Sequence, residues 1–483
     1  MLATTYIPSP HFLSAGDTSW QLTAATLVGL MSLPGIAVLY GGIVKKKWAV
    51  NTMVMAFAAF SLVLVVWVLW AYKMGFGSSW LHLGSSARGT VLGKPGTVLG
   101  AGAELGRASI PQSGNLAGPG LQLSSSALVY FQFVFAAITP LLFLGSVLGR
   151  MSLKAWLIFV PLWTTCAYTV NAMLLWGGGF WAQRGALDYS GGYVIHLAAG
   201  TTGFVAAAII GPRLKSDRDS FTPNNLLLVA AGAGILWLGW NGFNGGDPYF
   251  ANGDAAAAVL NTNLATAGAL LTWFVMDIVG GPKKANFLGS VNGMIVGLVA
   301  ITPAAGFVDG YGALVIGVLS SGIVWFSWNK MAGRGIFARV DDALGVVHTH
   351  GVAGLCGGML VGFFADPKMA EYYAVGPHGK LTPVSSAGLF YGHPGQVLIQ
   401  AGAALTIIAW DGLVTVVLLK FIEKALRVPL RLTDRELEIG DAAIHLEEVL
   451  GPEDVLGLGA MAGLDNGPRE RDRRELVGEG SPT

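Results

Sequence analysis

The chain has 483 residues, of which 53% are hydrophobic and only 12% are charged. A soluble domain carries about 25% charged residues, and the mean hydropathy of +0.59 indicates that hydrocarbon is the solvent for much of this surface. These values exclude a soluble globular protein and predict an all-α polytopic membrane protein. The net charge of +1 gives no indication of a nucleic-acid partner.

Eleven stretches of the sequence are long enough to cross a bilayer as helices. Ten of them, each of about 20 residues or more, contain no Asp, Glu, Lys or Arg, and the eleventh is interrupted only by Asp411. An odd number of spans places the two termini on opposite sides of the membrane. The predicted spans are 20–44, 48–72, 126–149, 155–176, 189–212, 220–243, 255–276, 285–303, 310–329, 343–364 and 396–419.

Lysine and arginine are concentrated in alternate loops. Thirteen lie in five short loops, whereas seven lie in the longer loops on the opposite side. Because basic loops are retained in the cytoplasm, we expect the N-terminus outside and the C-terminus inside. The expected location is the plasma membrane. Residues 1–19 are interpreted as an extracellular extension without a signal peptide. Residues 20–421 form the membrane domain, with a solvated extracellular loop at 73–125, and 422–483 form a cytoplasmic tail with a disordered end.

One pattern occurs once in each half of the chain. An aspartate stands eight residues before a histidine, and glycines follow that histidine at the fourth and seventh positions. The first copy is Asp188, His196, Gly200 and Gly203, and the second is Asp342, His350, Gly354 and Gly357. Spans one to five are therefore expected to repeat as spans six to ten. Since five is odd, the second copy is inverted in the membrane, and span eleven lies outside this five-plus-five repeat.

The two histidines of this pattern are the main candidates for function. Each lies about seven residues into its span, so an inverted repeat brings His196 and His350 to one depth, where their rings could touch. Two separate core histidines bonded to backbone carbonyls are the alternative. We expect neither a metal site, since no third ligand lies at that depth, nor a cofactor. His348, two residues from His350, points to a different helix face and is interpreted as structural.

Two aspartates, Asp188 and Asp342, open spans five and ten. Both suit the role of a helix N-cap that compensates the helix dipole. The alternative is a buried negative charge that assists the approach of a cation. Asp188 is the better candidate for that role because it follows the glycine-rich turn 176–179, through which backbone can approach a ligand closely.

The chain resembles the ammonium transporters of the Amt/Mep/Rh superfamily, specifically the Amt branch. The resemblance covers nearly every span and some 400 residues. It rests on seven motifs in family order: Leu33–Gly42, Phe131–Ala136, Trp176–Gly179, Gly185–Gly192, Gly239–Asn244, Val299–Gly306 and Asp341–Gly351.

The resemblance implies an eleven-helix protomer with its own pore, assembled as a homotrimer. It further implies that Phe135 and Trp176 line an outer ammonium site, because aromatic faces attract small cations. Phe131 or Phe135 with Phe243 would form a gate that excludes water. His196 and His350 would be the twin histidines that accept a proton from ammonium while neutral ammonia crosses the pore. K⁺ has no proton to give, which is how such a pore would reject it.

The sequence departs from the family pattern at several positions. Four residues after the gate phenylalanine of span six, the usual serine is replaced by Asp247. We expect Asp247 at the rim of the outer vestibule, where its charge attracts ammonium. Gly345 and His348 stand where an aspartate and a glycine are common. In the tail, 434–448 resembles the regulatory C-terminus that a PII-type signalling protein can engage.

The sequence therefore predicts an ammonium transporter that lies in the lipid bilayer. We do not expect an enzyme, because no nucleophile, metal set or nucleotide loop accompanies the histidines. Two alternatives remain open: an ammonium receptor that hardly conducts, and a neutral ammonia channel like those of the Rh branch.

Overall fold

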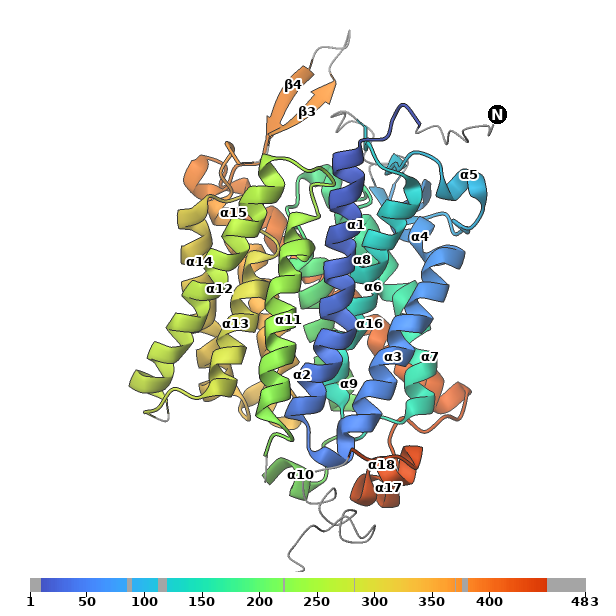
Figure 1. The fold of residues 1–483 in the computed structure, drawn as a ribbon, viewed down its shortest axis with the longest axis vertical. Helices are drawn as coiled ribbons and strands as arrows, with labels where there is room; N and C mark the ends of the chain where they lie inside the picture. Colours follow the sequence, from blue (N-terminus) through green and yellow to red (C-terminus); the bar gives the residue numbers. More distant parts are fainter. Residues whose placement is uncertain are drawn as a thin grey trace, which may run out of the picture.

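The computed structural model describes residues 10–84, 89–111, 120–219, 222–281, 283–369, 371–375 and 381–449. Within these ranges the chain is a bundle of long helices (Figure 1). Ten of the described helical segments are long and apolar enough to cross a membrane, and α13 is apolar but shorter, at 15 residues. Because α13 occupies the expected span 285–303, every predicted span corresponds to a helix.

The helices of the bundle are frequently built from two shorter helices joined end to end. Their bounds are α1 Ala15–Leu30, α2 Ile36–Ile43, α3 Ala49–Val66, α4 Tyr72–Phe76, α6 Ser125–Val147, α7 Leu153–Trp163, α8 Thr169–Leu175, α9 Ala198–Ile210, α11 Leu226–Gly245, α12 Gly253–Gly280, α13 Phe287–Ile301, α14 Gly310–Phe326, α15 Ala353–Phe364 and α16 Gly395–Lys420.

Wider π-helical turns join or extend several of these helices. Such turns usually appear singly and are frequent at functional sites. In the first span the turn contains Pro34, which cannot donate the usual backbone hydrogen bond. The π-helical turns are Met31–Gly35, Trp67–Ala71, Thr164–Tyr168, Gly192–Leu197, Ser327–Met331, Val347–Val352 and Phe421–Ala425.

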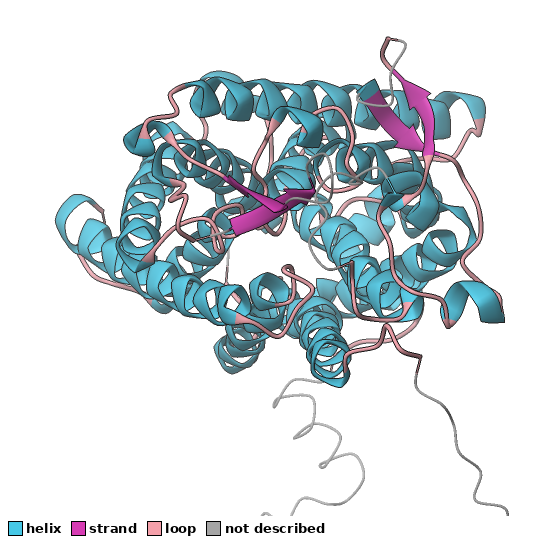
Figure 2. Ribbon diagram, turned by 90° about the horizontal axis from the view of Figure 1, so that it is seen from above, coloured by secondary structure: helices cyan, strands magenta, loops and turns pink. Residues whose placement is uncertain are grey.

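The remaining elements lie at the two ends of the bundle. We call the end where α1 begins the N-terminal face and the opposite end the tail face (Figure 1). The tail face carries α10 (Lys215–Asp219), α17 (Asp434–Ile439) and α18 (Asp441–His445). Viewed along the bundle, two antiparallel strand pairs cover parts of the N-terminal face (Figure 2). They are β1 Ser79–His82 with β2 Thr90–Gly93, and β3 Glu371–Val375 with β4 Leu381–Ser385.

The loop 73–125 is more closely packed than the sequence suggests. It contains β1, β2 and α5 (Ala101–Glu104), and Thr90 is completely buried. The carbonyl of Thr90 accepts a hydrogen bond from the backbone N–H of Phe180 at 2.8 Å. The expectation of a solvated insertion is therefore wrong for this part of the loop, because its backbone pairs with the turn that follows α8.

The tail that follows α16 contains two short helices. Gly440 has a φ of +85°, and it separates α17 from α18. The Asp441 carboxylate accepts backbone hydrogen bonds from Val50 at 2.7 Å and Asn51 at 2.9 Å, in the first turn of α3. The described part of the tail is therefore docked on the tail face. The expected disordered end lies outside the described residues.

Candidate functional site

The two histidines predicted to meet do so in the interior of the bundle. Their Nδ1 atoms lie 3.2 Å apart, and the ring planes are inclined by 25°. His196 is fully buried and His350 is 4% exposed. The Nε2 atom of His196 is buried and has no hydrogen-bond partner within the described ranges. The pair can therefore share a proton through Nδ1 while a polar ring atom faces an otherwise apolar space.

Both histidines lie on π-helical turns that open a span. His196 lies on the turn Gly192–Leu197 before α9, and His350 on Val347–Val352 before α15. The chain leaves α9 toward the tail face and leaves α15 toward the N-terminal face, so these two helices run in opposite directions (Figure 1). This antiparallel pairing agrees with an inverted repeat.

The aspartate that precedes each histidine caps its helix. Asp188 accepts hydrogen bonds from the backbone N–H groups of Tyr193 and Val194, both at 3.0 Å. Asp342 accepts one from Val347 at 2.7 Å. The capping interpretation therefore describes both acids. Because backbone donors occupy the Asp188 carboxylate, its charge would act on a ligand through space and not by direct contact.

The repeated glycines allow the two histidine helices to approach each other. A side chain at Gly200 would collide with the backbone of Gly351, and one at Gly354 would collide with the carbonyl of Gly192. Only glycine, which has no Cβ atom, fits such a close contact with another backbone. Gly200 of α9 therefore packs on the turn that bears His350, and Gly354 of α15 packs on the turn that bears His196.

Three phenylalanines lie next to the histidine pair. The rings of Phe135 and Phe243 are stacked, with centroids 4.2 Å apart and planes inclined by 17°. The ring centroids of Phe131 and Phe135 are 4.7 Å apart, and those of Phe243 and His196 are 6.0 Å apart. All three phenylalanines are fully buried. The expected gate residues thus form one row of contacting rings that reaches His196.

Trp176 lies beside this row of rings, with its ring edge-on to Phe135 at 6.0 Å. Its indole N–H donates a hydrogen bond to the backbone carbonyl of Asp188 at 2.7 Å. The contact fixes the ring plane while leaving the rest of the indole free to face a ligand. Phe135 and Trp176, which the resemblance assigns to one outer site, therefore lie in one cluster with the backbone of Asp188.

Asp247 lies next to the same cluster, just beyond the end of α11. The preceding Gly246 lies against the ring of Phe131, and the Ser190 hydroxyl neighbours the Asp247 carboxyl. The Oδ2 atom of Asp247 is shielded from solvent and has no hydrogen-bond partner among the residues described. Leaving a carboxylate oxygen buried without a partner is costly. The residue is therefore suited to receive a donor or cation that arrives from outside.

Two other polar departures from the family pattern lie away from this cluster. His348 is bonded through Nδ1 to the Ser327 hydroxyl at 2.8 Å, and its ring packs on Phe337. The Asp411 carboxylate accepts hydrogen bonds from the Asn171 amide at 2.9 and 3.1 Å. His348 thus points away from the pair, as its helix position predicts. Asp411 connects α16 to α8.

Sequence reasoning missed one aromatic residue of the site. Trp240 stacks on His196, with ring centroids 5.3 Å apart and planes inclined by 19°. Its indole N–H is held by the Thr302 hydroxyl at 2.9 Å. Trp240 stands three residues before Phe243, and this i, i+3 spacing on one helix face is the signal that could have identified it.

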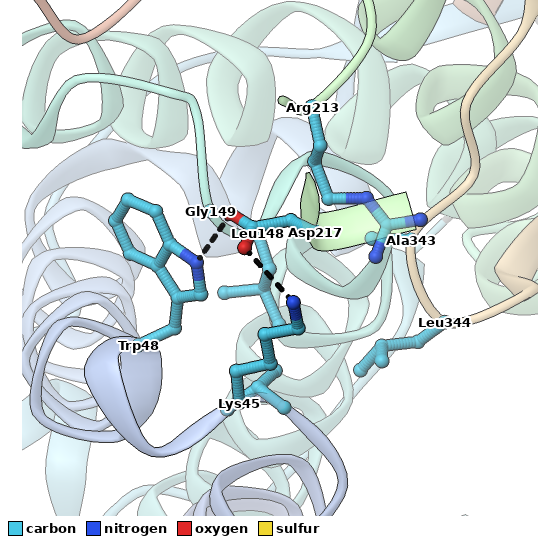
Figure 3. Close-up of a pocket in the computed structure, with 9 residues that line it drawn as sticks. Lys45, Trp48, Leu148, Gly149, Arg213, Asp217, Ala343 and Leu344 are labelled. Atoms are coloured by element: carbon cyan, nitrogen blue, oxygen red, sulfur yellow. Dashed lines mark hydrogen bonds and ion pairs between the residues drawn. The ribbon is translucent and has the colours of Figure 1, made fainter. Parts of the chain in front are cut away.

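A separate small cavity lies at the tail face (Figure 3). Its volume of about 20 Å³ is enough for one water molecule. Lys45 and Trp48 both bond Asp217 there, as the dashed lines show. It is lined by Val44, Lys45, Trp48, Leu148, Gly149, Arg213, Asp217, Ala343 and Leu344.

Comparison with known proteins identifies the family. The sequence model of the Ammonium Transporter Family matches residues 19–449. The chain belongs to this family. Ammonium transporter 3 member 2 of Oryza sativa subsp. japonica is 49% identical over 448 residues, which cover 90% of each chain. Ammonium transporter 2 of Arabidopsis thaliana is 48% identical over 454 residues, which cover 92% of this chain and 91% of that one.

Solved structures of the family share the fold. The crystal structure of Saccharomyces cerevisiae Mep2 superposes with a TM-score of 0.74 at 28% identity, and covers 91% of this chain and 95% of that chain. A structure titled Sensor Amt Protein superposes with a TM-score of 0.72 at 21% identity, which is a likeness of fold alone. The chain is therefore a multi-span membrane protein of a transporter family, as its sequence predicts.

Proposed function

We propose that the protein conducts ammonium across the plasma membrane as ammonia and a proton that separate within each protomer. The observation that carries this proposal is the order of the site: an acceptor-bearing aromatic cluster, a dry row of phenylalanine rings and a histidine pair. A cation entering from the N-terminal face would meet these elements in that sequence. The names of the curated relatives support ammonium as the substrate.

Recruitment would occur between Trp176, Phe135 and Asp247, with the capping charge of Asp188 beneath them. Aromatic faces attract a desolvated cation by about 2 kcal/mol. A carboxylate about 4 Å from the cation adds roughly 4 kcal/mol at an effective dielectric constant near 20, and less where water screens it. The unpartnered Oδ2 of Asp247 would accept a hydrogen bond from ammonium. The site would thus replace part of the hydration shell that ammonium loses.

Passage would begin when the contacting rings of Phe131, Phe135 and Phe243 move apart. A hydrated ion cannot enter an apolar gap without a large desolvation cost, whereas neutral ammonia can. The His196 and His350 pair would take up the proton and pass it along the pore. K⁺ cannot be divided in this way. The protein would therefore discriminate ammonium from K⁺ by the proton that ammonium can give up, and not by size.

The orientation, assembly and partner of the protein are also proposals. We propose an outside N-terminus, an inside C-terminus and a homotrimeric assembly. The basic residues gathered around the tail-face cavity support the cytoplasmic position of that face. The docked tail, with α17 and α18 against the first turn of α3, offers a surface that a PII-type protein could displace. We propose transport without an enzymatic reaction.

Electrical recording from proteoliposomes tests this proposal. A saturable current driven by an ammonium gradient, and absent with K⁺, is expected. Ammonia flux without current would instead identify a neutral channel. Saturable ammonium binding with neither current nor flux would identify a receptor.

A further inference from the structure

Helix α16 lies outside the inverted repeat, yet it presents a line of buried polar side chains to the bundle. Gln396, Gln400, Asp411 and Thr415 are at most 4% exposed. Polar groups at this depth are costly unless they are bonded, and they frequently mark functional sites. Gln400 has the largest number of partners of the four.

The amide of Gln400 uses all of its hydrogen-bonding capacity. Nε2 donates to the carbonyl of Leu187 at 2.7 Å and to the carbonyl of Gly358 at 2.8 Å. Oε1 accepts from the backbone N–H of Leu187 at 2.8 Å and from Gln396 Nε2 at 3.2 Å. The side chain therefore holds both polar groups of one residue in an irregular segment. It also attaches that segment to α15, which belongs to the other half of the repeat.

The segment held by Gln400 carries the groups that orient the site. Leu187 is followed by Asp188, whose carbonyl accepts the indole N–H of Trp176. The carboxylate of Asp188 caps the turn that bears His196. A displacement of the Leu187 peptide would therefore move the tryptophan and the start of the histidine helix together.

We infer that Gln400 is a positioning residue, which acts through the Leu187–Asp188 peptide to set the orientation of Trp176 in the outer ammonium site. The inference rests on the proposed function of that site. Gln400 does not touch the substrate. Groups that hold metal ligands from behind typically change affinity or activity by about 10- to 100-fold when they are mutated, and we expect an effect of the same kind here.

The decisive variant is Gln400→Met, which keeps the size of the side chain and removes its hydrogen bonds. We expect the half-saturating ammonium concentration to rise roughly tenfold, with maximal current changed less than twofold. Thr406→Val is the matched control, because it removes a bond from α16 to Trp181, outside the site. This control should leave half-saturation unchanged. If Thr406→Val raises it equally, Gln400 has only a packing role and the inference fails.

A double-mutant cycle tests the route of action. Trp176→Phe removes the indole bond to Asp188, so Gln400→Met should have a much smaller effect in that background. Additive effects would overturn the inference. If Gln400→Met does not fold, Gln400→Asn decides by the same measurements, because the shorter amide cannot span Leu187 and Gly358.

The failure of the inference is distinguishable from failure of the proposed function. A native protein without ammonium current contradicts the proposed function. If the folded Gln400→Met variant has the same current and the same half-saturating ammonium concentration as the native protein, only the role of Gln400 is contradicted.

Discussion

Two acids, one at each end of the bundle, differ in the partners of their shielded carboxylate oxygens. At the tail face, Asp217 is 4% exposed and forms ion pairs with Lys45 and Lys47, both at 3.2 Å. At the N-terminal face, Asp247 keeps a shielded oxygen with no partner among the described residues. A buried charge without a partner is far more costly than a paired one. The contrast agrees with a structural role for Asp217 and with the proposed role of Asp247 in binding ammonium.

Other polar groups of the tail face follow the first pattern. Arg213 binds Asp341 with two nitrogens, at 2.7 and 2.9 Å. Arg150 is fully buried, and its guanidinium donates to backbone carbonyls that include those of Ser146 and Gly211. Arginine suits such multiple bonding because its donors are fixed in a plane. The comparison therefore predicts that tail-face variants change stability and that N-terminal-face variants change the handling of ammonium.

The largest effect is expected at the histidine pair, which lies buried in the interior of the bundle. His196→Ala and His350→Ala should each reduce ammonium current at least about a hundredfold or admit K⁺, because the proton would lose its acceptor. Current recording with ammonium and with K⁺ measures both outcomes. His348→Ala is the control on the same helix and should keep ammonium selectivity. Native current in both pair variants would remove the relay role.

Breaking the ion pairs of Asp217 should lower stability without changing affinity. Asp217→Ala leaves Lys45, Lys47 and the Trp48 N–H without their shared acceptor. We expect a loss of about 2 kcal/mol, below the value for a fully buried pair because the lysines can rehydrate. Thermal unfolding in detergent measures the decrease in Tm. A changed half-saturating ammonium concentration in this variant would contradict the division between the two ends.

Asp247→Ser should have the converse effect. Replacing the carboxylate by the hydroxyl common in the family removes its attraction for a cation. We expect the half-saturating ammonium concentration to rise severalfold, more at low ionic strength than at high, with maximal current little changed. Thermal stability should stay equal to or above that of the native chain. An unchanged half-saturation at low salt would show that Asp247 is only a loop residue.

The smallest effect concerns the docked tail. Burial raises the pKa of Asp441 to about 6, so its protonation favours docking below that pH, and this stabilisation is lost as pH rises through about 6. Burial lowers the pKa of His445, so acidification through its pKa disfavours docking. These opposite signs partly cancel in the native chain, in which Lys47, Glu447 and Glu448 lie nearby.

Asp441→Asn removes the protonation that favours docking of the tail at low pH. Its tail should therefore loosen more than the native tail when the pH falls from about 7 to 5. A spin label at position 438, in a chain whose native cysteines are replaced by serine, reports this loosening as increased mobility. Equal mobility changes in the two chains would show that Asp441 does not titrate with docking.

The spans, their approximate ends and the histidine pair were predictable from the sequence because each depends on local composition or spacing. Hydrocarbon excludes charge, so uncharged stretches identify helices. The matched spacing of His196 and His350 predicted a contact that the structure places at 3.2 Å. The ordered motifs over some 400 residues indicated the family that comparison then confirmed.

Tertiary structure alone decided which polar side chains are partnered. The sequence presents Asp188, Asp217, Asp247 and Asp411 as four acids near helix ends or inside spans. Packing gives the first a helix to cap, the second two lysines and the last an asparagine, and it leaves the Oδ2 atom of Asp247 without a hydrogen-bond partner among the described residues. Gln400 lies in a span outside the repeat, and the sequence alone does not show that it bonds the backbone of Leu187. The physical reason is that hydrophobic patterning is read along the chain, whereas a hydrogen-bond partner is supplied by whichever segment the fold brings within 3 Å.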